Sequence, residues 1–294
     1  MVQVELVRVV TSDQLSLDGA LQWAVGDSSG LLDLDAMILL HGVGSNFYGS
    51  TLMEGMAAAL VASGVSALRV NTRGHDTVST ARRGDGAAQI GAAYEKVDDA
   101  CLDISAWTDY LLHRGCRSVG VLGHSLGAVK ACYAQAFKPH PQVACLIPVS
   151  PPRLSCAAFR QAPESSGFIR SLREAESLIE ANRPSDLFFS RFPIPTLMSA
   201  ECYIDKYGPA ERYNVVKFVD RIACPSLFVF GQAELDQGGI AFAGMPEAIV
   251  AAGPATLDVE VVSGANHFYA GRSDALIETV IDWLRSRFLH PDGA

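Results

Sequence analysis

Long apolar runs are missing from this sequence. No window holds 18 consecutive apolar residues, so no membrane-spanning helix is expected. The N-terminal stretch carries Glu5 and Arg8 among its apolar residues, and it lacks the basic region followed by an apolar region that marks a secretory signal. We therefore expect no membrane as a partner.

A surplus of basic residues is missing as well. The 23 Lys and Arg residues are outnumbered by 32 Asp and Glu residues, which gives a net charge of −9. Nucleic acids and anionic membranes bind basic surfaces, so this charge argues against both as partners.

The patterns that bind metals and cofactors are missing too. The seven cysteines are odd in number and contain no C-x-x-C pair, and several lie in apolar runs such as VACLIPV. We interpret them as reduced, mostly buried thiols, which predicts a cytoplasmic protein. No H-E-x-x-H is present, and Gly42-Val43-Gly44 lacks the third glycine of a dinucleotide-binding loop because Phe47 takes its place. We expect no metal and no cofactor.

The sequence does contain an alternation of strand-like and helix-like segments. Apolar residues make up 49% of the 294 residues, enough for a sizeable core. Short apolar runs that are expected to form buried strands lie at residues 36–42, 65–71, 118–124, 143–150, 225–231 and 257–264. Helical periodicity is found between them, at residues 51–63, 95–114, 126–137 and 274–289. This order predicts an α/β fold with a mostly parallel central sheet and helices on both faces.

The start of the chain has a different pattern. Residues 4–10 and 19–25 are two strand-like runs on either side of the turn-forming pair Asp18-Gly19. This arrangement favours an antiparallel strand pair at that end of the sheet.

The strand–helix alternation also breaks after the middle of the chain. Residues 168–184 are helical in pattern, and the stretch after them is rich in aromatic residues and proline. We interpret residues 156–222 as an insertion that forms a helical cap over the carboxyl edge of the sheet. Residues 1–155 and 223–294 then form the core, and the aromatic residues of the insertion favour a role in lining a pocket.

The strongest chemical signal is Gly123-His124-Ser125-Leu126-Gly127, which matches G-x-S-x-G. A buried strand, VGVL, leads into it, and a helix with small residues follows. A sharp turn between a strand and a helix forces the serine into a strained conformation with an exposed hydroxyl group. The N-terminus of that helix favours a developing negative charge. This context predicts that Ser125 is a nucleophile.

Four motifs together resemble the α/β-hydrolase superfamily, over about residues 3–290. They are His41-Gly42 after the third strand, Arg73-Gly74-His75 after the fourth, the Ser125 motif after the fifth, and Gly264-Ala265-Asn266-His267-Phe268 after the last. The resemblance implies the α/β-hydrolase fold, with its cap where the insertion lies. It also implies loop-supporting roles for His41, His75 and His124.

A serine hydroxyl group becomes a good nucleophile only when a base takes its proton. His267 occupies the superfamily's base position, and the resemblance implies that role for it. The acid of this fold lies between the serine and the histidine in sequence, in the loop after LFVFG. Similar proteins have G-x-x-D there, which places Glu234 in the acid position, with Asp236, two residues later, as the alternative.

Two backbone N–H groups are needed to bind the oxyanion of an acyl-transfer intermediate. Leu126, the residue after the nucleophile, is expected to supply one, and Val43, in the glycine-containing loop after His41, the other. Residues that follow strand ends are expected to line the substrate pocket: Phe47, Tyr48, Pro151, Pro152 and Phe268.

These residues predict a serine hydrolase that cleaves a carboxylic ester, thioester, lactone or amide of a small organic molecule through an acyl-enzyme. Acyl transfer to an alcohol or amine, and hydrolysis of a carbon–carbon bond, use the same residues and stay open as alternatives. A ligand-binding receptor on the same scaffold is a further alternative, since a fold does not fix a function. Rapid reaction of the serine with a fluorophosphonate distinguishes the enzyme from the receptor.

Overall fold

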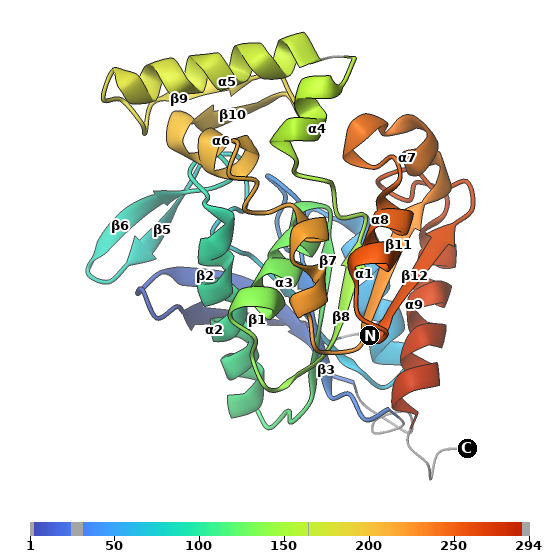
Figure 1. Ribbon diagram of the computed structural model, residues 1–294. Helices are drawn as coiled ribbons and strands as arrows, with labels where there is room; N and C mark the ends of the chain where they lie inside the picture. The colour runs from blue at the N-terminus through green and yellow to red at the C-terminus, as the bar shows by residue number, and fades with distance from the viewer. Residues whose placement is uncertain (1–2, 25–31, 164, 290–294) are drawn as a thin grey trace.

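An eight-stranded sheet forms the centre of the molecule (Figure 1). The structure is a computed structural model that describes residues 3–24, 32–163 and 165–289. The strands of the sheet are β1 Glu5–Val10, β2 Ser16–Gln22, β3 Ala36–Leu40, β4 Ser66–Val70, β7 Val119–His124, β8 Val143–Val149, β11 Ser226–Gly231 and β12 Leu257–Val262. Their spatial order is β1-β2-β4-β3-β7-β8-β11-β12. Strand β2 is antiparallel to both of its neighbours, and pairing from β4 to β12 is parallel.

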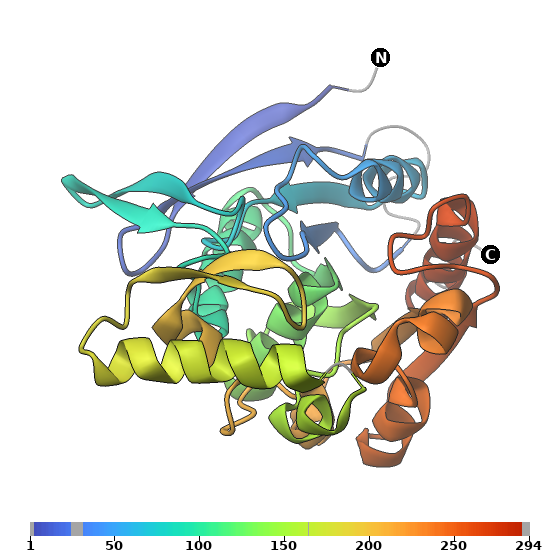
Figure 2. The same cartoon turned by 90° about the horizontal axis from the view of Figure 1, so that it is seen from above.

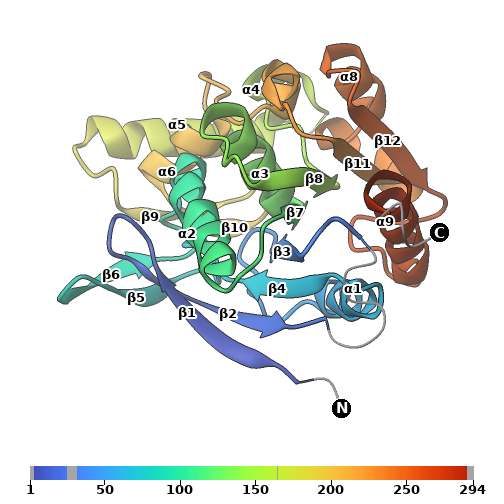
Figure 3. The same ribbon diagram turned by 90° about the horizontal axis from the view of Figure 1, so that it is seen from below.

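Helices cover both faces of this sheet. One face carries α2 Ala100–His113, α3 Leu126–Phe137 and α8 Met245–Ala252, and the other carries α1 Thr51–Ala62 and α9 Ser273–Phe288 (Figure 3). The central strands are mostly apolar, as expected where both faces of a sheet are covered, and every residue of β3 and β7 is buried. The predicted α/β fold with a mostly parallel sheet is therefore confirmed. No helix within the described residues is both long and apolar enough to cross a membrane.

The antiparallel pair at the start of the chain forms, but the predicted turn was wrong. Asp18 lies inside β2 and pairs with Arg8, and the turn runs instead over residues 11–15. The Thr11 hydroxyl group closes that turn by accepting the N–H of Leu15 at 3.0 Å. Gly19 is needed for close packing, since a Cβ there would lie 2.8 Å from a carbonyl oxygen of β4.

Several short elements were not predicted. A hairpin of β5 Ser79–Arg83 and β6 Gly86–Ile90 follows β4, and the short helix α7 Gln232–Gln237 follows β11. Within residues 156–222, α5 Ser165–Glu180 is the helix expected at residues 168–184, whereas α4 Cys156–Gln161, β9 Leu187–Ser190, β10 Thr196–Ser199 and α6 Ala200–Tyr207 were not predicted. The unpredicted elements are too short, or too dependent on contacts with the rest of the fold, to give a periodic pattern of their own.

The elements from α4 to α6 lie together on one side of the molecule, above the central strands (Figures 1 and 2). They are joined to the core by backbone and side-chain contacts. The N–H of Ser199 donates to the carbonyl oxygen of Ala93 at 2.8 Å, and Lys96 forms an ion pair with Glu201 at 2.9 Å. Pairing of β9 with β10 adds a two-stranded sheet to what the sequence pattern predicted as helical.

Glu211 ties the end of this segment to its beginning. Its carboxylate accepts hydrogen bonds from the Ser155 hydroxyl group and the Ala157 N–H at 2.8 Å each, and pairs with Lys217 at 2.7 Å. Burial alone would raise the pKa of Glu211, but these donors lower it from 4.5 to about 2.

Glu211→Gln is expected to lower the free energy of unfolding at pH 7 by about 1–3 kcal/mol. Because the pKa is lowered in the folded state, the carboxylate stabilises the fold fully above pH 4.5, and this contribution is lost as the pH falls toward 2. Urea unfolding between pH 7 and pH 2 should therefore show a smaller loss of stability in the variant. Asp220→Asn, at an exposed carboxyl in the same segment, is the control and should keep the parental pH dependence.

Candidate functional site

Ser125 lies between β7 and α3 in a conformation that L-residues rarely adopt. Its φ is 56° and its ψ is −120°, and its N–H donates to the carbonyl oxygen of Val149 at 2.9 Å. This is the strained strand-to-helix turn that the G-x-S-x-G pattern predicted. The turn places the serine at the N-terminus of α3, where the first backbone N–H groups have no partner inside the helix.

The flanking glycines are required by close packing. A Cβ at Gly123 would lie 2.3 Å from the carbonyl oxygen of Gly127, and a Cβ at Gly127 would lie 2.5 Å from that of His41. A Cβ at Gly42 would lie 3.3 Å from the Cβ of Ser125. The loop after β3 therefore lies directly against the serine.

His267 reaches the serine from the loop after β12. Its Nε2 is 3.0 Å from the Ser125 Oγ. The Asn266 side chain shapes this loop by accepting the N–H groups of Phe268 and Ala270, each at 3.1 Å. The ring is partly exposed, so it faces solvent on one side and the serine on the other.

Glu234 binds the other side of the His267 ring. Its Oε1 accepts from His267 Nδ1, and its Oε2 accepts from the Gly231 N–H at 3.2 Å and from the Ser150 hydroxyl group at 2.6 Å. The carboxylate is buried as the third residue of α7, where it also satisfies a free N–H at the start of that helix. Of the two candidate acids, the structure brings Glu234 to His267. Asp236 is exposed and accepts from the Gln232 amide at 2.9 Å.

Sequence reasoning missed Ser150. It follows β8 with a φ of 50°, is fully buried, and lies 3.0 Å from the Tyr269 hydroxyl group. A polar residue at the carboxyl end of an apolar strand was the signal that could have found it.

Ser150→Ala is expected to lower kcat/KM by roughly tenfold, because Glu234 loses a hydrogen bond worth about 1–2 kcal/mol that orients it toward His267. Steady-state kinetics with one ester substrate measure the effect. Ser226→Ala is the matched control, since this buried hydroxyl group donates to the nearby Cys224 carbonyl at 3.0 Å and belongs to the first residue of β11, at the opposite end of that strand from Gly231. Equal losses in the two variants would contradict a role for Ser150 in orienting the acid.

Two further histidines support the loops around the serine. His124 donates from Nε2 to the carbonyl oxygen of His267 at 2.7 Å, and burial together with the His267 ring lowers the pKa of His124 to about 4. His41 donates from Nδ1 to the carbonyl oxygen of Gly42 at 2.7 Å, and its Nε2 accepts the N–H of Thr72 at 3.1 Å. Burial and the charge of Lys130 lower the pKa of His41 to about 3, so both rings are neutral at pH 7.

The His41 hydrogen bond determines the orientation of one peptide group. The carbonyl of Gly42 and the N–H of Val43 belong to the same planar, trans peptide and point in opposite directions. Holding the carbonyl on the His41 side therefore directs the Val43 N–H away from that ring. Val43 and Ser125 line the same cavity.

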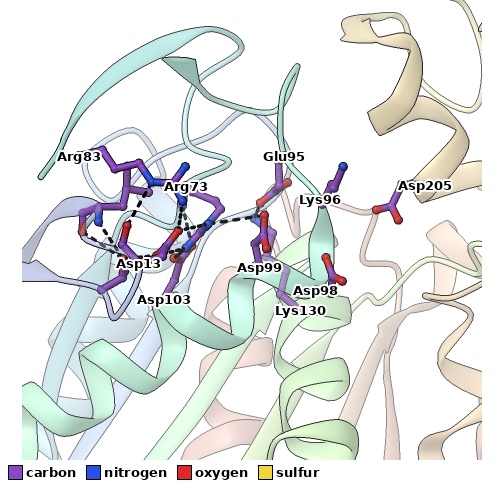
Figure 4. A network of polar contacts seen from close by, with 12 residues as sticks. Asp13, Arg73, Arg83, Glu95, Lys96, Asp98, Asp99, Asp103, Lys130 and Asp205 are labelled. Atoms are coloured by element: carbon purple, nitrogen blue, oxygen red, sulfur yellow. Dashed lines mark hydrogen bonds and ion pairs between the residues drawn. The ribbon is translucent and has the colours of Figure 1, made fainter. Parts of the chain in front are cut away.

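The loop after β4 is held by the arginine of the R-G-H motif. Arg73 donates from its side chain to Asp103 of α2 at 2.8 Å and to Asp13 of the β1–β2 turn at 3.1 Å (Figure 4). Its backbone N–H also donates to Asp103 at 2.8 Å. These bonds fix the neighbouring Thr72, which binds His41. His75 pairs with Asp76 at 2.9 Å in the same loop.

A cavity of about 470 Å³ opens over Ser125 and His267. Of the predicted pocket residues, Phe268 lines it and is largely exposed. Phe47 and Tyr48 instead line a neighbouring cavity of about 750 Å³ beside β1, β2 and β5. Pro151 lines neither of these cavities and is buried after β8. Ser45, Gly49 and Ser50 of the same loop do line the Ser125 cavity, so the two aromatic residues lie in the part of the loop that does not line it.

The expectation that aromatic residues of the insertion line the pocket was also wrong for this cavity. Most of these rings pack against one another and form a small core of the segment itself: Phe159, Phe168, Phe188, Phe192, Tyr203 and Tyr207. Phe189 is exposed on β9. Ile194, between β9 and β10, is the residue that the segment contributes to the described lining of the Ser125 cavity.

Across residues 3–24, 32–163 and 165–289, no group of three or more His, Cys, Asp or Glu side chains is placed to hold a metal ion. The cysteines described there are free thiols, and Cys224 is the least buried of them. Burial raises the pKa of Cys101 and Cys116 to about 11, so neither is a reactive thiolate at neutral pH.

Comparisons with known proteins agree with this architecture. GrgF, an alpha/beta hydrolase from Penicillium sp. sh18, is 14% identical with a TM-score of 0.70, covering 98% of this chain and 100% of that chain. Est1E from Butyrivibrio proteoclasticus, solved with ferulic acid bound, is 19% identical with a TM-score of 0.64, covering 96% of this chain and 99% of that chain. An esterase of Pyrococcus furiosus is 16% identical with a TM-score of 0.61, covering 98% and 92%.

At these identities the solved structures show a shared fold. No curated protein sequence matches this chain. A sequence model of the alpha/beta hydrolase family, however, matches residues 37–279, which include the strands from β4 to β12, the serine turn and the His267 loop. The chain therefore belongs to the alpha/beta hydrolase family.

Proposed function

We propose that this protein is a serine hydrolase that cleaves a carboxylic ester of a small, uncharged organic molecule through an acyl-enzyme. The observation that carries the proposal is the continuous chain of hydrogen bonds from Ser125 Oγ through His267 to a buried Glu234. A buried carboxylate that orients a histidine toward a strained serine is the arrangement that activates a hydroxyl group. Esterases among the solved structures of the same fold support the ester as substrate.

In the proposed reaction each residue of the site has a separate part. Ser125 Oγ attacks the ester carbonyl carbon while His267 Nε2 takes its proton, and Glu234 stabilises the imidazolium that forms. The Leu126 and Val43 N–H groups bind the oxyanion. His267 then protonates the alcohol that leaves, and a water molecule, deprotonated by His267, attacks the acyl-enzyme and releases the acid and Ser125.

The lining of the cavity favours a neutral substrate. Its described residues include no Asp, Glu, Lys or Arg side chain. Small hydroxyl-bearing and apolar side chains face the cavity instead, among them Ser50, Leu52, Met53 and Ile194. A charged substrate would lose its hydration here without an opposite charge to replace it.

The test is covalent labelling followed by turnover. A fluorophosphonate should label the parent protein rapidly at Ser125, as shown by peptide mass spectrometry, and p-nitrophenyl esters of graded chain length should be hydrolysed. An unlabelled Ser125, or labelling without turnover of any ester, would contradict the proposal, and the second result would favour a receptor.

We further propose that residues 156–222 act as a cap that sets specificity through Ile194. Ile194→Ala enlarges the cavity, so the ratio of kcat/KM for long over short acyl esters is expected to rise by roughly tenfold. Phe189→Ala is the matched control, because this exposed ring of β9 does not line the cavity. The panel of p-nitrophenyl esters gives the ratio for each variant. A ratio that rises equally in both variants, or in neither, would contradict the role of Ile194.

A further inference from the structure

Three buried charged side chains meet where residues 156–222 contact the core. Glu95 comes from the loop before α2, Lys130 from α3 and Lys206 from α6, and none of the three side chains has any exposed surface. Glu95 Oε1 forms a close ion pair with Lys130, and Glu95 Oε2 lies 3.6 Å from the Lys206 Nζ (Figure 4 labels Glu95 and Lys130). The cluster therefore joins the segment to the helix that follows Ser125.

A gain in the stability of the folded protein is a weak explanation for this buried cluster of charged side chains. Removing charges from water is costly, and apolar side chains of similar volume often stabilise a core as well or better. The cluster also contains two cations for one anion. Burial lowers the pKa of Lys206 despite the attraction of Glu95, whereas the two lysines outweigh burial and lower the pKa of Glu95.

The cluster continues as a chain of hydrogen bonds into the site. Lys130 Nζ donates to the Thr72 hydroxyl group at 2.8 Å. The Thr72 N–H donates to His41 Nε2 at 3.1 Å, and the Thr72 Oγ1 lies 3.2 Å from the same nitrogen. His41 in turn holds the Gly42 carbonyl, and with it the direction of the Val43 N–H. Each side chain in this path is buried.

The packing around Glu95 leaves its carboxylate no room to shift toward Gly74. A Cβ at Gly74 would lie 2.0 Å from Glu95 Oε1, so the backbone of the R-G-H motif packs directly on that oxygen. A displacement of Lys206 is therefore passed on to Lys130 and Thr72.

We propose that Lys206, Glu95, Lys130 and Thr72 are positioning residues that connect the seating of residues 156–222 on the core to the orientation of the Val43 N–H. This inference rests on the proposed function, in which Val43 binds the oxyanion. Residues 156–222 then help to orient an oxyanion-binding N–H group in addition to lining the substrate cavity.

The test is a double-mutant cycle with Lys206→Met and Thr72→Val. Each single variant is expected to lower kcat by about tenfold, less than the 10²–10³ that follows removal of an oxyanion donor, with KM changed less than about threefold. Inhibition by an aryl trifluoromethyl ketone, whose adduct with Ser125 places an oxyanion between the two donors, should weaken by the same factor as kcat. Because both residues act through one path, the double variant should lose about as much as one single variant.

Two control variants match these changes. Lys217→Met removes another lysine–glutamate ion pair of the same segment, at an exposed position, and should leave kcat and ketone inhibition unchanged. Thr72→Ser keeps the hydroxyl group and should recover most of the kcat that Thr72→Val loses. Thermal unfolding of every variant separates loss of fold from loss of positioning. If Lys206→Met does not fold, the comparison of Thr72→Val with Thr72→Ser tests the proposal by itself.

Equal kcat in Thr72→Val and Thr72→Ser, or losses in kcat that multiply in the double variant, would overturn the proposal. A loss that falls on KM alone would overturn it as well. Fluorophosphonate labelling of the parent protein is independent of these results. An unlabelled Ser125 would reject the proposed function itself, whereas a labelled Ser125 with multiplying losses rejects the connection alone.

Discussion

Ser125→Ala is expected to lower kcat by about 10⁶-fold, the largest effect among the substitutions considered. Alanine lacks the oxygen that attacks the carbonyl carbon, and no neighbouring side chain of the described site can replace it at the same position. The residual rate should be that of binding and oxyanion stabilisation alone. Hydrolysis of a p-nitrophenyl ester measures the loss.

The same variant separates chemistry from folding. Alanine keeps the Cβ and the strained backbone of Ser125, so the melting temperature should stay close to that of the parent. Fluorophosphonate labelling should disappear while substrate analogues still bind. A variant that retains more than a small fraction of the parental rate would show that Ser125 is not the nucleophile.

Glu234→Gln is expected to lower kcat by about 10⁴-fold. The Gly231 N–H and the Ser150 hydroxyl group both donate to Oε2, so the amide oxygen of the variant takes that place. Its NH₂ group then faces His267 Nδ1 and donates to it. The proton of the ring is forced onto Nε2, which can no longer accept the proton of Ser125.

Asp236→Asn is the control for this change. The Asp236 side chain is exposed and bonds the Gln232 amide, so its loss should change kcat by less than about twofold, as for a solvated carboxylate. Steady-state kinetics and a pH–rate profile of both variants make the comparison. The opposite ranking would move the acid to Asp236 and would require α7 to rearrange.

The central sheet and the serine turn could be predicted from the sequence because their signals are local. A buried parallel strand is a short apolar run, and a strand-to-helix turn with crowded neighbours needs the glycines found at positions 123 and 127. The alternation of these signals determines which edge of the sheet holds Ser125 and His267.

The contacts that orient the site could not be predicted in this way. Ser150, Lys206 and Thr72 reach their partners from distant parts of the chain, and although Ser150 stands at the carboxyl end of an apolar strand, no local pattern shows which residue each of the three contacts. The direction of a loop is equally nonlocal, which is why Phe47 and Tyr48 were expected at the wrong cavity. The aromatic residues of the insertion indicated burial correctly, but they pack against one another and into the main core, and not into the Ser125 cavity.

The packed aromatic rings of the insertion and Ile194 differ in the substitutions that they can accept. The rings of α4, α5, β9, the β9–β10 loop and α6 pack against one another and are not among the described lining residues of the Ser125 cavity, to which the segment contributes Ile194. Substitutions of Ile194 can therefore change the shape of the cavity without removing any of those rings, whereas Phe192, in the same loop between β9 and β10, is one of them. In evolutionary terms, substitutions of Ile194 can change substrate preference while the packed rings keep the insertion folded.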